Sequence, residues 1–125
     1  MKRVLMLTVP HKCQRYDTVG DYETGHGFTV IRVSDMGNEQ YEHLVAVHEL
    51  VEHILCVARG IKEADIDRFD IGYETDRDPG DENEPGWSPL APYHKEHVFA
   101  EKIERLLGEE LGIDWDIYDK TVTAL

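Results

Sequence analysis

The sequence predicts an α+β fold in which a small N-terminal antiparallel sheet packs on two main helices. Three observations favour this class. Strand-like runs fill the first third of the chain, two long helical segments follow, and an acidic loop rich in proline and glycine lies between those helices. With 125 residues and a hydrophobic fraction of 41%, the chain has the size and composition of one domain, residues 1–125.

The first third predicts two or three strands. Residues 2–9 contain the apolar run VLMLTV and are followed by Pro10, which ends a strand. Residues 15–22 form a second, poorer candidate. Residues 24–27, TGHG, have the composition of a turn, and residues 28–34, FTVIRVS, show the clearest strand pattern in the chain. Because a short turn joins the last two segments, we expect an antiparallel arrangement.

Two helices are expected next along the chain. Residues 39–59 follow Asn38, a good N-cap residue, and precede Gly60, which suits the position just after a helix. Residues 62–72, KEADIDRFDIG, predict a shorter helix with a partly apolar face. The first of these segments is the more apolar and is therefore expected to lie in the core.

A loop over residues 73–92 holds four of the five prolines and much of the acidity. Long loops of this kind are either solvated or functional, and this one could bind cations or lie over a site. Residues 93–111 then predict the last helix, with Pro92 at its first position, an apolar stripe through Phe99 and Leu106, and Gly112 after its end. An apolar tail at residues 115–118 should pack back on the body.

The formal net charge of −13 opposes binding to phosphate backbones, so we expect no nucleic-acid partner. No run is long enough for a membrane helix, and the N-terminal segment lacks the features of a signal peptide, which predicts no membrane association and a cytoplasmic location. Two cysteines are too few for a disulfide framework, and we expect Cys56 to be a core residue. A protein partner fits the acidic surface, whereas the oligomeric state is not indicated.

The segment LVAVHELVEHILCVA, residues 44–58, carries the strongest functional signal. Eleven of its fifteen residues are apolar, and the other four, His48, Glu49, Glu52 and His53, lie together in its middle. Carboxylates in an apolar helix are costly unless they are paired or bind a metal ion. Imidazole and carboxylate groups are both good ligands for Zn²⁺.

Helical spacing shows which of these groups can act together. His48 and Glu52 are four apart and share a face, as do Glu49 and His53. On the last helix, His94, His97 and Glu101 share another face, with Glu104 next along it. Packing the two helices side by side would bring the histidines together, which predicts a divalent metal site, with Zn²⁺ as the favoured ion. The candidate ligands are His48, Glu52, His53, His94, His97 and Glu101.

Three simpler interpretations remain open. His48 could be a hydrogen-bonded core histidine, Glu49 and Glu52 could pair with a cation such as Arg59, and the face of His94 and Glu101 could be exposed. If the site is catalytic, Glu49 is the natural general base beside the ligand His48. If it is structural, four protein ligands would close it.

The motif HELVEH resembles the His-Glu-x-x-His helix of the zincin metalloproteases, in which two histidines bind zinc and the glutamate is the general base. His48 and Glu49 match the first two positions. The fifth position holds Glu52, and His53 comes one residue later, about 140° round the helix from His48. A zincin-like site here would therefore need Glu52 in place of the second histidine.

A second resemblance covers about residues 16–118. The runs VIRVSD, LVAVHELVEHILC, APYHKEH, IERLL and ELGIDW look like a family of uncharacterised phage and bacterial small proteins. That resemblance implies a phage or prophage origin, with the host cytoplasm as the location. It implies no activity, so a non-enzymatic phage accessory protein that acts by binding a protein is an alternative to a metal-dependent hydrolase.

A third class is the all-α nucleotide pyrophosphohydrolases, which hold Mg²⁺ with Glu-x-x-Glu pairs. The pairs Glu49/Glu52 and Glu101/Glu104 have this spacing. The histidines favour a softer ion than Mg²⁺, however, and the N-terminal strands do not fit an all-α fold.

Overall fold

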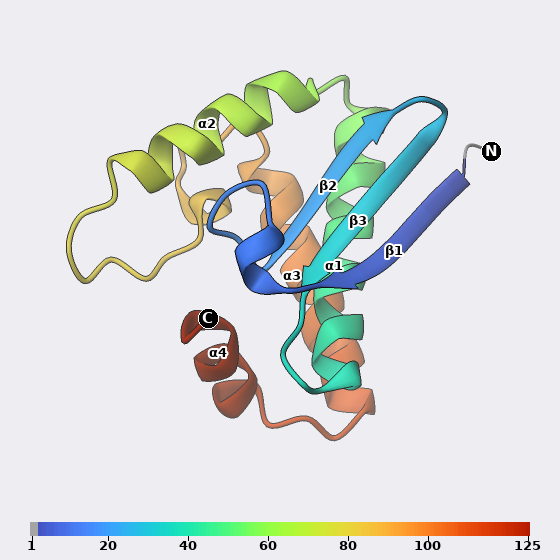
Figure 1. Ribbon diagram of the computed structural model, residues 1–125, viewed down its shortest axis with the longest axis vertical. Helices are drawn as coiled ribbons and strands as arrows, with labels where there is room; N and C mark the ends of the chain where they lie inside the picture. Colours follow the sequence, from blue (N-terminus) through green and yellow to red (C-terminus); the bar gives the residue numbers. More distant parts are fainter. Residues whose placement is uncertain (1–2) are drawn as a thin grey trace.

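The computed structural model describes residues 3–125 and confirms an α+β fold (Figure 1). The strands are β1 (Arg3–Val9), β2 (Gly20–Gly25) and β3 (Phe28–Ser34). The helices are α1 (Glu39–Ala58), α2 (Glu63–Thr75), α3 (His94–Glu110) and α4 (Trp115–Thr123), with short 3-10 turns η1 (His11–Cys13) and η2 (Pro85–Trp87). The first strand was predicted from Lys2, which lies outside the described residues.

The sheet is mixed, in the order β1-β3-β2. β2 and β3 pair antiparallel, as predicted, whereas β1 and β3 pair in parallel, so the prediction of a wholly antiparallel sheet is wrong. The chain reverses direction twice between β1 and β3, and β3 then takes the central position between the other two strands. Both edges of β3 are thereby satisfied with hydrogen bonds.

The hairpin between β2 and β3 turns at His26 and Gly27, which both have positive φ, 50° and 81°. Positive φ at both central residues defines the two-residue turn that matches strand twist. β2 starts later than the sequence indicated, at Gly20, because the residues before it bend away from the sheet. Arg15, expected in that strand, instead forms ion pairs with Asp21 and Asp67.

Helix α1 lies between the sheet and α3 (Figure 1). It begins at the predicted cap, where the Asn38 side chain accepts a hydrogen bond from the backbone N–H of Tyr41, and it ends before Gly60, which has φ of 68°. Its apolar composition suggested burial on every side, but one side of the helix is exposed. Ile54 and Val57 are exposed, since neither the sheet nor α3 covers that side.

The apolar core lies between α1 and the inner face of the sheet. Ile31 and Val33 of β3 point inward from alternate positions, and Tyr22 of β2 lies beside Ile31 in the register. They pack with buried residues of α1 and α2: Leu44, Val45, Ala46, Cys56 and Ile66. This side of α1 is an ordinary hydrophobic interface.

Helix α3 turns its polar face inward. Glu96, His97 and Glu104 are buried, whereas Phe99 is 46% exposed and Leu106 is 58% exposed. Two small residues on the inner face, Ala100 and Gly108, allow α3 to approach α1; a Cβ at Gly108 would lie 3.8 Å from the Leu44 side chain. The closeness of the two helices therefore brings their polar groups together.

The remaining segments cover the ends of this helix pair. The loop is shorter than predicted, because α2 continues to Thr75 and the turn η2 lies within the predicted loop. Pro92 does not occupy the first position of α3, because it precedes the N-cap residue, Tyr93. The predicted apolar tail forms α4, with Tyr118 buried. Within residues 3–125, none of the helices combines the length and apolar character that crossing a membrane requires.

Candidate metal centre

Three potential donor atoms meet where α1 and α3 pack together. Nε2 of His48 lies 2.9 Å from Oε2 of Glu52 and 3.2 Å from Nδ1 of His97, and Nδ1 of His97 lies 2.9 Å from the same Glu52 oxygen. All three side chains are buried. Tetrahedral Zn²⁺ bonds of about 2.1 Å would place the ligand atoms roughly 3.4 Å apart, so these atoms would have to separate by a few tenths of an ångström to hold the ion.

The orientation of His48 is fixed from its other ring nitrogen. Nδ1 lies 2.7 Å from Oε1 of Glu104, and the Tyr118 hydroxyl donates to Oε2 of the same carboxylate at 2.5 Å. Because a carboxylate only accepts, Nδ1 carries the proton and donates it to Glu104. Without an ion, Nε2 likewise donates to Glu52; with an ion bound there, Nε2 would lose that proton and present its lone pair to the ion, the arrangement in which a carboxylate orients a histidine ligand.

His97 lies in a closely fitted pocket below η2. A Cβ at Gly86 would overlap its ring, and Trp87 packs edge-on against it with ring centroids 5.2 Å apart. Its Nε2 is buried and has no hydrogen-bond partner among residues 3–125; the nearest carboxylate, that of Glu84, lies 3.5 Å away. His48, Glu84 and His97 each place one donor atom within 4.8 Å of the others. Glu84 is therefore a fourth candidate around the same centre.

Charge in this cluster is set by mutual hydrogen bonding. Burial raises the pKa of Glu52, but the hydrogen bonds from His48 and His97 outweigh it and lower the pKa to about 2. Burial lowers the pKa of His48, yet its hydrogen bonds to Glu104 and Glu52 hold the pKa well above the usual value. The position between Nε2 of His48 and Glu52 thus strongly attracts positive charge, whether a proton or a metal ion.

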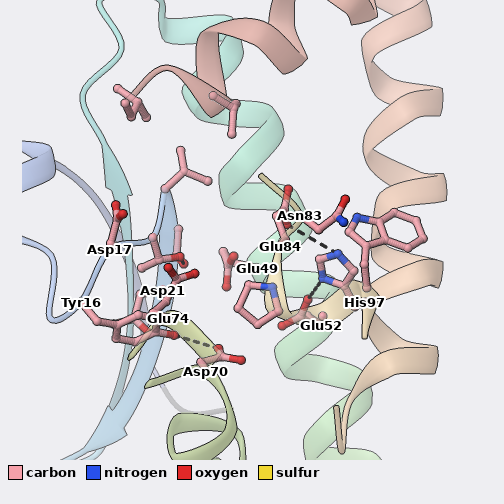
Figure 2. A pocket seen from close by; sticks show the side chains of 18 of the residues that line it. Tyr16, Asp17, Asp21, Glu49, Glu52, Asp70, Glu74, Asn83, Glu84 and His97 are labelled. Atoms are coloured by element: carbon pink, nitrogen blue, oxygen red, sulfur yellow. Dashed lines mark hydrogen bonds and ion pairs between the residues drawn. The ribbon is translucent and has the colours of Figure 1, made fainter. Parts of the chain in front are cut away.

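Glu49 lies beside the cluster but outside its hydrogen bonds. Within residues 3–125 no group is within hydrogen-bonding distance of its carboxylate, which points into a cavity (Figure 2). Gly20 makes room for it, since a Cβ there would come within 2.8 Å of a Glu49 oxygen. Burial, followed by the nearby charge of Glu52, raises the pKa of Glu49 well above its ordinary value.

The cavity has a volume of about 430 Å³ and is strongly acidic. Twelve of the described residues that line it are aspartates or glutamates, whereas Arg77 is its one arginine or lysine. Glu84 lines the cavity with 48% of its side chain exposed, and desolvation by the surrounding protein raises its pKa. Figure 2 shows Glu49, Glu52, Glu84 and His97 around one space.

The other predicted ligands lie elsewhere. His53 faces the sheet, where its Nε2 is 3.4 Å from the Thr29 hydroxyl and its ring packs on Tyr22. His94 is 2.9 Å from the Gly86 carbonyl oxygen and so holds η2 in place. Glu101 lines the cavity but lies 3.5 Å from Arg105. The structure brings together only His48, Glu52 and His97 of the six.

Two residues of the site were not among the predicted ligands. Glu104 shares the face of His97 and could have been included on spacing alone. Glu84 comes from the acidic loop, whose path over the helices no periodic pattern reveals. The suggestion that this loop lies over a site agrees with the position of Glu84 at 3.5 Å from His97.

Comparisons with protein-family models, with curated proteins and with solved structures found no match for this chain.

Proposed function

We propose that this protein binds a divalent metal ion, with Zn²⁺ as the best fit, through His48, Glu52 and His97. The observation that supports this most is the meeting of three donor atoms from two helices, with the ring of His48 held in orientation by Glu104. Two imidazoles and a carboxylate match the preferences of Zn²⁺ better than those of Mg²⁺ or Ca²⁺. Glu84 would be a fourth ligand or would hydrogen-bond His97.

We further propose that the site catalyses hydrolysis. If Glu84 hydrogen-bonds His97 and does not bind the ion, the three protein ligands leave one position open, which is the pattern of catalytic zinc sites; with Glu84 as a fourth ligand the site would be a closed, structural one. When bound, the ion would supply Lewis acidity to a substrate carbonyl and lower the pKa of a nearby water molecule. Glu49 faces the same cavity, next along the helix from the ligand His48, and a carboxylate in that position could accept a proton from a water molecule beside the ion.

The negative charge of the cavity limits the classes of substrate that it could bind. Twelve carboxylates would repel a phosphate chain unless several cations screened them, so a neutral or cationic substrate such as a peptide fits better. A Mg²⁺-dependent pyrophosphohydrolase fits less well, because both oxygens of Glu104 already accept hydrogen bonds from His48 and Tyr118. That carboxylate is thus not free to hold Mg²⁺.

One observation favours a second, non-enzymatic candidate. A protonated His48 would donate to Glu104 and Glu52 at the same time, giving a paired buried network that needs no metal. The protein would then be an accessory protein that acts through its surface. Metal content separates the two candidates directly.

The test is a zinc measurement on protein purified without a nickel column. Elemental analysis and calorimetric titration with Zn²⁺ should show about one ion per chain, and His48→Ala should lose it. His43→Ala is the matched control, because His43 lies on the same helix but is exposed and pairs only with Glu39. Equal zinc content in wild type and His48→Ala would rule out this ligand set.

The catalytic proposal is tested with Glu49→Gln on a panel of peptide and ester substrates. The change should lower hydrolysis about 100-fold or more while leaving zinc content and melting temperature nearly unchanged. Glu101→Gln, at the edge of the same cavity, is the control and should retain activity. If Glu49→Gln instead removes the zinc, Glu49 is a ligand and not a base.

A further inference from the structure

Asp70 of α2 is a buried carboxylate in the wall of the acidic cavity. It is 7% exposed, and its two oxygens each accept one hydrogen bond, from the Tyr16 hydroxyl at 2.9 Å and from the Tyr93 hydroxyl at 2.5 Å. The tyrosine hydroxyls orient the carboxylate but bring no positive charge to it. Each oxygen still has a lone pair for a further donor, so Asp70 can bind a group that enters the cavity.

Asp70 lacks the basic partner that several carboxylates around the same cavity have. Arg15 pairs with Asp21, and Arg77 pairs with Glu74. In the part of the chain that the structure describes, no arginine, lysine or histidine forms an ion pair with Asp70. Burying a carboxylate without a positive partner is costly, and this burial raises the pKa of Asp70 to about 7. A ligand with a positive charge would supply the missing partner.

A second group in the same cavity is available to a ligand. Tyr22 of β2 is 6% exposed, and its buried hydroxyl has no hydrogen-bond partner among residues 3–125. Buried hydroxyls are normally hydrogen-bonded, so a ligand that enters the cavity would gain a bond here that the described chain does not make. The oxygen of this hydroxyl can accept from an N–H group. Tyr22 therefore indicates a polar ligand independently of the acidic residues.

Tyr93 joins the Asp70 end of the cavity to the candidate metal centre. Its hydroxyl donates to Asp70, and its ring packs edge-on against His97 with ring centroids 6.1 Å apart. Figure 2 shows Asp70 on the same space as Glu52 and His97, and all three line one cavity. One bound molecule can therefore contact Asp70 and the proposed metal ligands at the same time.

We propose that Asp70 recognises the basic side chain of a lysine or arginine in a peptide substrate. This inference rests on the proposed hydrolytic function, because it assigns the substrate class of that same site. An ammonium or guanidinium group donates to the Asp70 oxygens, and a guanidinium group can donate to both at once. The methylene stem of the side chain lies along the cavity wall, to which Tyr16 and Tyr93 belong.

A second metal ion fits this position less well than an organic cation. Both Asp70 oxygens already accept hydrogen bonds from hydroxyl groups, whereas a metal ion needs several ligand atoms that point at it. Within residues 3–125, the side chains with donor atoms close enough to hold an ion are His48, Glu84 and His97, and Asp70 is not among them. The hydrogen-bonding pattern around Asp70 therefore favours an N–H donor.

The test is calorimetric titration of the whole protein with Nα-acetylarginine amide. About pH 8 keeps Asp70 ionised, and about 0.15 M salt screens the general acidity of the surface. The matched probe is Nα-acetylcitrulline amide, which has nearly the same shape but no charge. The arginine amide should bind about 10-fold more tightly or better. Equal affinity of the wild type for the two probes would overturn the proposal without the use of any variant.

Two variants locate the binding site. Asp70→Asn should lower the affinity for the arginine amide about 10-fold, to that for the citrulline amide. Glu82→Gln is the matched control: it removes one charge from the same cavity at an exposed position and should retain the affinity to within about 2-fold. If both variants weaken binding equally, general acidity attracts the probe and the assignment to Asp70 is wrong. If Asp70→Asn does not fold, the comparison of the two probes on the wild type decides.

The cation site and the proposed hydrolysis can fail separately, because the titration needs neither metal nor turnover. If no peptide is cleaved, the hydrolytic proposal is wrong, and the titration still decides whether Asp70 binds a basic side chain. If peptides are cleaved, those with arginine should be cleaved about 10-fold faster at low concentration than the same peptides with citrulline. Equal cleavage of the two would show that the substrate class assigned here is wrong.

Discussion

The two sides of α1 make contrasting interfaces. Toward the sheet, α1 packs on Ile31 and Val33, and this layer is mainly apolar, with His53 and Thr29 as its polar members. Toward α3, the same helix places His48 and Glu52 against His97 and Glu104, all of them buried and joined by hydrogen bonds. The helix therefore has one side that stabilises the fold and one that holds ionisable groups.

This contrast separates stability from function. Burying apolar surface stabilises a protein by about 25 cal/mol per Å², whereas a buried charged network roughly breaks even against its desolvation. The chain had apolar residues available for the second interface, since Phe99 and Leu106 of α3 lie exposed on the outside. An interface that leaves those residues outside and buries histidines and glutamates is the arrangement that the proposed metal site requires.

The largest expected effect on the free energy of unfolding comes from the interface between α1 and the sheet. Ile31→Ala removes a fully buried side chain from the core and should lower the free energy of unfolding by about 3 kcal/mol. The zinc bound per folded molecule should not change, because Ile31 contacts the side of α1 opposite the donor atoms. Urea unfolding together with metal analysis measures both quantities.

The matched control for that variant is Val30→Ala, one residue earlier on the outer face of β3, where the side chain is only half-buried. It should lower the free energy of unfolding by about 1 kcal/mol or less. A loss of zinc in Ile31→Ala would show that the two interfaces are coupled and would break the distinction drawn between them.

A second prediction concerns Asp70 of α2, a carboxylate in the polar cleft. It accepts hydrogen bonds from Tyr16 and Tyr93, but burial outweighs these bonds and raises its pKa from 3.8 to about 7. A carboxyl group with a raised folded-state pKa stabilises the protein below its unfolded pKa and loses that contribution as pH rises through the folded pKa. Stability from this residue should thus fall between pH 4 and pH 7.

The measurement is the free energy of unfolding of wild type and Asp70→Asn across that range. The shift corresponds to about 4 kcal/mol, and water in the cleft should reduce it, so we expect the difference between the two proteins to change by about 2 kcal/mol. Asp76→Asn, at the exposed end of the same helix, should show no such change. A constant difference between wild type and Asp70→Asn would mean that Asp70 titrates normally.

Much of the fold follows from local sequence. The caps at Asn38 and Gly60 bound α1 to within a residue, and the turn at His26 and Gly27 fixes the hairpin of β2 and β3. The parallel pairing of β1 could not be predicted, because local turn chemistry specifies only strands that are adjacent in the chain. Composition does not give the strand order either, because β1 has more apolar residues than β3 and still lies at the edge of the sheet.

The candidate site also has a part that the sequence predicts and a part that it does not. The spacing of His48, Glu52 and His97 on two helices predicts that they can meet, and the structure places them within 3.2 Å of one another. His53 and His94 have equally good spacing on the same helices, yet they face the sheet and η2. Periodicity gives the faces of each helix, but the packing angle and the loop path decide which faces meet.

The smallest expected effect tests how far the polar interface depends on its outer support. Tyr118→Phe removes the hydroxyl that donates to Glu104, and that carboxylate in turn orients His48. We expect a loss of about 1 kcal/mol in the free energy of unfolding and a decrease of up to about 10-fold in zinc affinity.

Tyr41→Phe is the control: its ring packs on Tyr118 at 5.1 Å, but its hydroxyl is not among the groups bonded to Glu104. If both variants weaken zinc binding equally, loss of either hydroxyl has the same effect, and the hydrogen bond from Tyr118 to Glu104 does not specifically tune His48. If Tyr118→Phe alone weakens it, the polar interface works as a connected unit that reaches from α4 to the donor atoms of α1.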